Sequence, residues 1–83
     1  MGFVEVLRLE SIMRAWLHIQ HEYDMFKWWI MLGYGLSIDQ HNYLYKSAEA
    51  AAKSAKRTAL KLGITIVDAE LHDNTGTRKF QLD

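Results

Sequence analysis

The chain has 83 residues, of which 49% are hydrophobic, and its ten basic side chains balance its ten acidic ones. This length suits one domain, and the apolar content is too high for a disordered chain. There is no cysteine, which excludes a disulfide framework and a thiolate metal site, and the charge balance argues against a globally cationic nucleic-acid binder. We therefore expect a single small folded domain spanning residues 1–83.

The apolar residues are not arranged as a membrane span. The longest uninterrupted apolar run extends from Trp28 to Leu32, whereas a membrane-crossing helix needs about 20 apolar residues. The first residues also lack the basic region, apolar stretch and cleavage site of a secretory signal. A cytoplasmic protein that does not bind membranes is therefore expected.

The segment before Asp24 is predicted to contain a short strand and a helix. The β-branched segment from Phe3 to Arg8 favours a strand, although a helix also fits it. From Leu9 to Tyr23 the apolar residues recur at helical spacing, which predicts an amphipathic helix with Trp16 in the core. Its apolar side would carry Leu9, Ile12, Met13, Trp16, Leu17, Ile19 and Tyr23. Its polar side would carry Glu10, Arg14, His18, His21 and Glu22.

A hairpin is predicted after Asp24. The segment from Met25 to Leu32 has the aromatic and β-branched content of a strand. Gly33-Tyr34-Gly35 then suits a tight turn, because glycine adopts positive φ without steric cost. A second strand from Leu36 to about Tyr43 would return beside the first.

A second helix and a final hairpin complete the predicted elements. Ser47 is a suitable N-cap and Gly63 a suitable C-terminal stop, which predicts a helix between them that ends near Leu62. The alternating segment from Ile64 to Leu71 predicts a strand, and Asp73-Asn74-Thr75-Gly76 a turn into an edge strand from Arg78 to Leu82. The small side of the helix, predicted to be buried, comprises Ala48, Ala51, Ala52, Ala55, Ala59 and Leu62.

This element order predicts an α+β fold. The order βαββαβ matches a ferredoxin-like antiparallel sheet with two helices on one face. The alternative lacks the first strand and consists of a helix, a β-hairpin, the Ala-rich helix and a second β-hairpin.

One face of such a sheet has no helix over it. Alternation along the strand from Met25 to Leu32 directs Trp28 toward the helices and Trp29 and Met31 away from them. Exposed Trp and Met beside charges are typical of an interface, whereas coverage by the C-terminal strand or a shifted register is the alternative. We predict that Trp29 and Met31, with Tyr34 of the turn, bind a protein partner or a second copy of the chain. The fourth strand would add Ile66, Asp68, Glu70 and His72.

Basic residues concentrate on the second helix. They could bind nucleic-acid phosphates or an acidic protein surface, and a solvated helix face is the simpler interpretation. These residues are Lys46, Lys53, Lys56, Arg57 and Lys61. Trp29, Tyr34, His41 and Tyr43 could stack on RNA bases, but the strand from Leu36 lacks the order of residues that RNA-recognition domains carry there.

The sequence contains no catalytic signature. It has neither a glycine-rich phosphate loop nor a nucleophile with a base at a recognisable spacing, and an Asp68 and Glu70 pair would more often face solvent. The histidines also lack a metal-binding spacing, so surface roles are expected for His18, His21 and the possible pair of His41 and His72. We therefore expect a non-enzymatic protein without a metal or cofactor.

The central part of the chain resembles a group of small viral proteins. From Phe26 to Leu71 it combines a Trp-rich hairpin, Tyr45-Lys46-Ser47 before an Ala/Lys helix, and Leu62-Gly63 before a strand. In size and element order this block is similar to phage-encoded anti-defence proteins, including anti-CRISPR proteins. The resemblance implies a stoichiometric inhibitor of a larger nucleic-acid-handling complex and implies no particular site residue. The alternative function is nucleic-acid binding through the basic helix 46–61 and the aromatic residues of the sheet.

Overall fold

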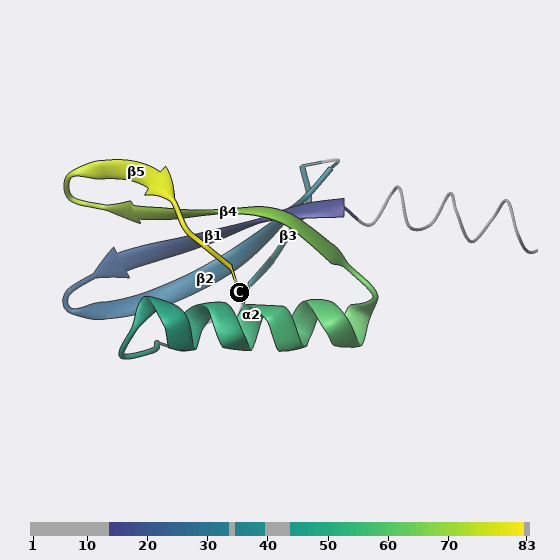
Figure 1. Cartoon of the computed structure of the whole chain (residues 1–83), viewed down its shortest axis with the longest axis horizontal. Coiled ribbons are helices and arrows are strands. Elements are labelled where there is room, and N and C mark those ends of the chain that lie inside the picture. Colours follow the sequence, from purple (N-terminus) through teal and green to yellow (C-terminus); the bar gives the residue numbers. More distant parts are fainter. Residues whose placement is uncertain (1–13, 34, 40–43, 83) are drawn as a thin grey trace, which may run out of the picture.

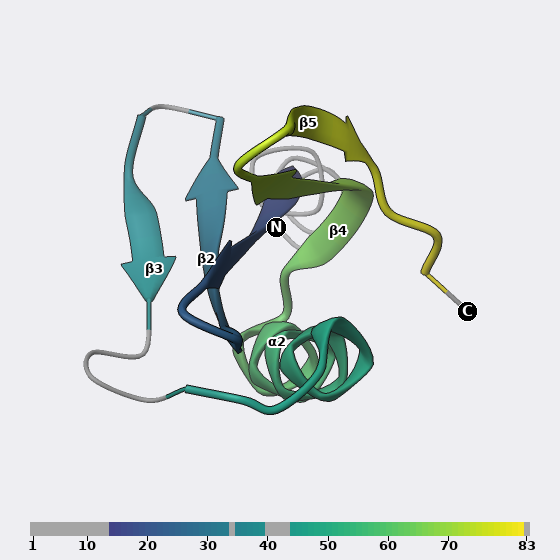
Figure 2. The ribbon, with the colours of Figure 1, turned by 90° about the vertical axis from the view of Figure 1, so that its left-hand side faces the viewer.

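The computed structural model describes residues 14–33, 35–39 and 44–82. This part of the chain forms one mixed sheet of five strands in the order β3-β2-β1-β4-β5, with a helix against one face (Figures 1 and 2). The elements are β1 (Arg14–Glu22), β2 (Met25–Leu32), β3 (Ser37–Asp39), α2 (Ala48–Leu62), β4 (Thr65–Asp73) and β5 (Gly76–Lys79). Among these elements, no helix is long and apolar enough to cross a membrane.

Strand β1 lies at the centre of the sheet. It pairs with β2 in an antiparallel hairpin and with β4 in parallel, from Arg14 beside Thr65 to Gln20 beside His72. A register shift between Ala15 and Trp16 breaks this parallel ladder. The parallel pair requires the chain to cross over between the two strands, and α2 lies on that crossover.

The sequence signals for α2 are confirmed. Ser47 has an extended backbone, and its Oγ accepts a hydrogen bond from the Ala50 N–H at 3.0 Å. Gly63 is left-handed, with φ of 71°, and ends the helix. The five predicted alanines are buried, but the prediction for Leu62 was wrong because this side chain is 48% exposed. Ile64, which follows the turn at Gly63, is buried at this end of the core instead.

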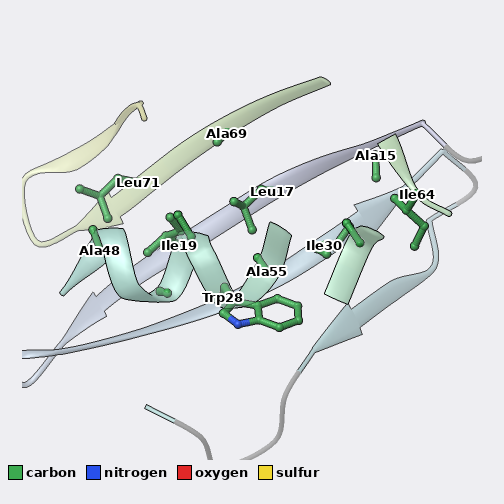
Figure 3. Packing of buried hydrophobic residues seen from close by; sticks show 13 residues of the cluster. Ala15, Leu17, Ile19, Trp28, Ile30, Ala48, Ala55, Ile64, Ala69 and Leu71 are labelled. Atoms are coloured by element: carbon green, nitrogen blue, oxygen red, sulfur yellow. The ribbon is translucent and has the colours of Figure 1, made fainter. Parts of the chain in front are cut away.

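The core lies between α2 and one face of the sheet (Figure 3). Leu17, Ile19 and Ile30 are fully buried, and Trp28 is 3% exposed. Because the helix presents mainly alanines, its backbone can approach the sheet closely, and the large Trp28 side chain fills space that alanines cannot. The Trp28 indole N–H donates to the Ser54 Oγ at 3.2 Å, so the polar atom of this core side chain is satisfied.

The predicted helix from Leu9 to Tyr23 was wrong for the residues that the structure describes. Ala15, Leu17 and Ile19 are buried at every second position, which is the period of a strand. The same apolar residues also fit a helical spacing, and pairing with both β2 and β4 decided between the two. Trp16 therefore lies on the opposite face with 44% exposure, and Tyr23 is 93% exposed in the turn before β2.

The ferredoxin-like order was also wrong, whereas the α+β class is confirmed. The described part has one helix, and its central strands β1 and β4 are parallel neighbours. The alternative arrangement was also wrong, because the described part of its first helix is strand β1. The predicted strand from Phe3 to Arg8, and residues 9–13 of the predicted helix, lie outside the described residues.

Both predicted hairpins are confirmed, with changed boundaries. Strand β3 pairs with β2 over Ser37–Asp39, and residues 40–43 of the longer predicted strand lie outside the described part. In the second hairpin, β5 covers Gly76–Lys79 and therefore begins inside the predicted turn.

Trp28 and Trp16 should contribute very differently to stability. Trp28→Ala removes a buried core side chain and should lower the free energy of unfolding by about 3–5 kcal/mol. Trp16→Ala, the matched control on the other face, should cost about 1 kcal/mol, the size of a strand-propensity difference. Urea denaturation followed by far-ultraviolet circular dichroism measures both changes. Equal losses would contradict the assignment of the two faces.

Candidate functional site

The face of the sheet opposite α2 carries most of the polar side chains of the strands together with Trp16 and Trp29, and we call it the open face. Strand pairing and alternation place one row of neighbouring residues across all five strands: Asp39, Trp29, His18, Glu70 and Lys79. A second row contains Ser37, Met31, Trp16 and Asp68. A third contains Lys27, Gln20, His72 and Thr77.

Two histidines and a glutamate meet in the middle of this face. His18 comes from β1, and Glu70 and His72 come from β4, two residues apart and therefore on the same side of the strand. The His18 Nδ1 lies 2.9 Å from the His72 Nε2 and 3.6 Å from the Glu70 Oε1. All three side chains are partly buried.

Neighbouring side chains hold the two imidazoles in place. The His72 Nδ1 lies 2.9 Å from the Thr77 Oγ1 of β5, within hydrogen-bond distance. The His18 ring stacks on the Trp29 ring, with centroids 5.1 Å apart and planes 9° apart. The two imidazoles stack on each other with the same centroid separation. The two rings therefore contact each other and side chains of the two flanking strands, β2 and β5.

The environment lowers the pKa of His18 below its ordinary value of 6.5. Burial of the ring is the main cause, because it disfavours the charged imidazolium. The neighbouring His72 adds repulsion, and the Glu70 carboxylate opposes both effects. His18 is therefore mainly neutral at neutral pH, with a nitrogen lone pair that can accept a hydrogen bond or bind a metal.

A hollow of about 270 Å³ lies beside this cluster. It is lined by Trp16, Leu17, His18, Asp68 and Glu70. Lys79 approaches Asp68 at 3.7 Å, which partly balances the two carboxylates. The combination of two imidazoles and carboxylates could hold a transition-metal ion, whereas no described residue of the hollow supplies a serine or cysteine nucleophile.

The structure does not bring the predicted partner-binding residues together. Trp29 and Met31 lie on the open face, which confirms the alternation predicted for β2. The basic residues predicted to bind a partner lie on the exposed side of α2, behind the other face of the sheet, and Tyr34 lies outside the described residues. These basic residues are Lys53, Lys56, Arg57 and Lys61.

Sequence reasoning missed the centre of the site. His18 was placed beside His21 and Glu22 on a helix, but on β1 it is separated from His21 by the alternation of the strand. One sequence signal indicated this strand: Ala15, Leu17 and Ile19 are apolar at every second position. No local pattern links His18 to His72, since 54 positions separate them.

His18 should make the protein less stable in acid. Its pKa is lower in the folded chain than in the unfolded chain, so the unfolded state binds the proton more tightly. This loss of stability begins as the pH falls through about 6.5 and is complete below the folded pKa. His18→Gln should therefore lose less stability than the wild type between pH 7.5 and 5.5, measured by urea denaturation with EDTA. His21→Gln is the matched control, and equal losses in the wild type and His18→Gln would contradict the expectation.

Comparison with known proteins adds no relative to these observations. No family model, curated protein or solved structure matches the chain.

Proposed function

We propose that this chain is a small non-enzymatic module that binds a protein partner through the open face of its sheet. The observation that carries the proposal is the group of large apolar side chains at the centre of that face. Trp16 is 44% exposed, and its cross-strand neighbour Met31 and the nearby Trp29 are only partly buried. Trp and Met are enriched in the buried centres of protein interfaces.

No element in the described part of the chain packs over this face. Helix α2 lies on the opposite face (Figure 2). The residues that follow β5 turn toward the helix, where Phe80 and Leu82 pack against the core and line a hollow with Lys53. The open face therefore combines apolar surface with access from solvent, and apolar surface of this kind favours association.

The dimensions of the open face suit a small interface. β1 and β4 have nine residues each, β2 has eight, and the edge strands β3 and β5 have three and four. At about 3.3 Å per residue and about 4.8 Å per strand, the five strands cover a flat area of about 500 Å². Side-chain relief makes the accessible surface larger than this flat area. Standard interfaces bury about 800 Å² on each partner, so the face can account for most of a small one.

The charges of the open face favour protein over nucleic acid. Strand alternation places more acids than bases there. The acids are Glu22, Asp39, Asp68 and Glu70, and the bases are Arg14, Lys27 and Lys79. A phosphate backbone would be repelled by this balance, whereas a protein surface can match mixed charges.

Following the resemblance to anti-defence proteins, we propose a subunit of a nucleic-acid-handling complex as the partner and stoichiometric inhibition as the outcome.

The basic helix supports a second candidate, nucleic-acid binding. Lys46 and the four exposed basic residues of α2 face solvent, with Glu49 as the acid among them. Phosphates could bind there. Because this surface lies behind the opposite face of the sheet, the two candidate functions use different residues and can be tested separately.

Photo-crosslinking should identify which surface binds. A photo-crosslinking amino acid at position 31 should give one discrete protein adduct in extracts of the native cell, and Trp16→Ser should weaken that adduct at least about tenfold, as expected for a central interface tryptophan. The same amino acid at position 57 on α2 is the control and should give no such adduct. The adduct mass distinguishes a second copy of this chain from another protein.

A gel-shift assay with random oligonucleotides at two salt concentrations completes the test. Salt-sensitive binding that is lost in the charge-reversal variant Lys53→Glu/Arg57→Glu would support the second candidate. Adducts from position 57 but not from position 31 would refute docking through the open face.

A further inference from the structure

We propose that His18, Glu70 and His72 bind one divalent transition-metal ion, for which Zn²⁺ is the best match. The ion would be bound by the His18 Nδ1, the His72 Nε2 and one carboxylate oxygen of Glu70. This inference does not depend on protein docking, because it rests on the positions of three side chains alone.

The three ligand atoms already lie near the required distances. Zn²⁺ binds imidazole nitrogen and carboxylate oxygen at about 2.0–2.2 Å, so tetrahedral ligands lie about 3.3 Å from one another. The His18 Nδ1 lies 2.9 Å from the His72 Nε2 and 3.6 Å from the Glu70 Oε1, and all three ligand atoms lie within 4.8 Å of one another. Side-chain movements of about 1 Å would complete the site.

The three ligand residues lie on two paired strands, and none of them lies in a loop. His18 and Glu70 are direct partners in the parallel pair of β1 and β4, and His72 follows Glu70 on the same face. A site built on two paired strands varies less in geometry than a site built on loops. The ion would join residues that lie more than fifty positions apart in the chain.

The contact with Thr77 is compatible with the tautomer that a metal requires of His72. The Thr77 Oγ1, 2.9 Å from the His72 Nδ1, can accept a hydrogen bond from the Nδ1–H. The Nε2 of His72 then carries its lone pair and points to the His18 Nδ1. This arrangement, in which the second ring nitrogen of a ligand histidine donates to an oxygen, is typical of metal sites.

Metal binding requires one proton to move. With His72 protonated at Nδ1, the proton between the two rings belongs to the His18 Nδ1 and is donated to the His72 Nε2. On binding, this proton leaves for solvent and another is taken up at the His18 Nε2, so that neutral His18 changes tautomer with no net release. Both nitrogen lone pairs then face the ion.

The ligand set selects the class of metal. Two imidazoles and one carboxylate suit Zn²⁺ and related transition metals, whereas Mg²⁺ and Ca²⁺ prefer sites made only of oxygen ligands. Three protein ligands leave one tetrahedral position for water. Because the three side chains are only partly buried, water can reach the cluster.

Titration of the tag-free chain with ZnCl₂ after EDTA treatment tests the proposal. Isothermal titration calorimetry should give one Zn²⁺ per chain, and CoCl₂ should give the visible absorption of a low-symmetry site with nitrogen and oxygen ligands. Zn²⁺ should also raise the urea denaturation midpoint, because the assembled site exists only in the folded state. Trp29 stacks on His18. Quenching by CuCl₂ of the total fluorescence of the three tryptophans therefore offers a third readout.

Variants assign the ligands. His18→Gln, His72→Gln and Glu70→Gln should each weaken Zn²⁺ binding at least about tenfold, and Thr77→Val about tenfold through the orientation of His72. His21→Gln, on the same strand but the other face, is the matched control and should bind within about twofold of the wild type. Circular dichroism confirms that each variant is folded before its affinity is compared.

Three results would overturn the assignment. The first is the lack of 1:1 Zn²⁺ binding by the wild type at millimolar concentration, which would make the cluster a hydrogen-bonded histidine pair only. The second is an equal loss of affinity in His21→Gln. The third is equally tight binding of MgCl₂ or CaCl₂, which would exclude a site selective for transition metals.

Discussion

The parallel pairing of β1 with β4 is the constraint on which the rest of the described structure depends. It gives β1 a partner on each side, and it requires a crossover on which α2 lies. It also brings His18 beside Glu70 and His72, which come from the far end of the sequence. If β4 paired instead with β3, the same residues would form no cluster, because β1 and β4 would then not be neighbours.

The small residues of α2 explain why the sheet has two different faces. Alanines allow the helix to lie close to Leu17, Ile19 and Ile30, but each buries little area, so Trp28 supplies much of the apolar surface of this core. The indole N–H requires a partner, and Ser54 provides it from within the alanine stripe. With a single helix in the described part, the opposite face carries polar side chains together with Trp16 and Trp29.

The two proposals meet on this open face. His18 and Glu70 lie in the row next to that of Trp16 and Met31, and His72 lies in the row beyond. A protein docked on the apolar centre would therefore also cover the near side of the cluster. Covering the cluster would remove water and strengthen its electrostatic interactions. The exposed side of α2 is strongly basic, whereas the open face carries charges of both signs. The protein-binding and nucleic-acid-binding hypotheses therefore concern different surfaces of the molecule.

Local signals determined part of this structure. Ser47 and Gly63 predicted the limits of α2, glycines and turn residues predicted both hairpins, and alternation along β2 predicted that Trp28 is buried and Trp29 is not. For these elements, the decisive interactions lie within a few residues of one another. Only the tertiary structure decided that residues 14–22 form a strand. The apolar residues around Leu17 fit both a helix and a strand, and pairing with β2 and β4 selects the strand. The site depends on the same pairing, since His18 and His72 are 54 positions apart and no periodic pattern in the sequence reports a contact over that separation.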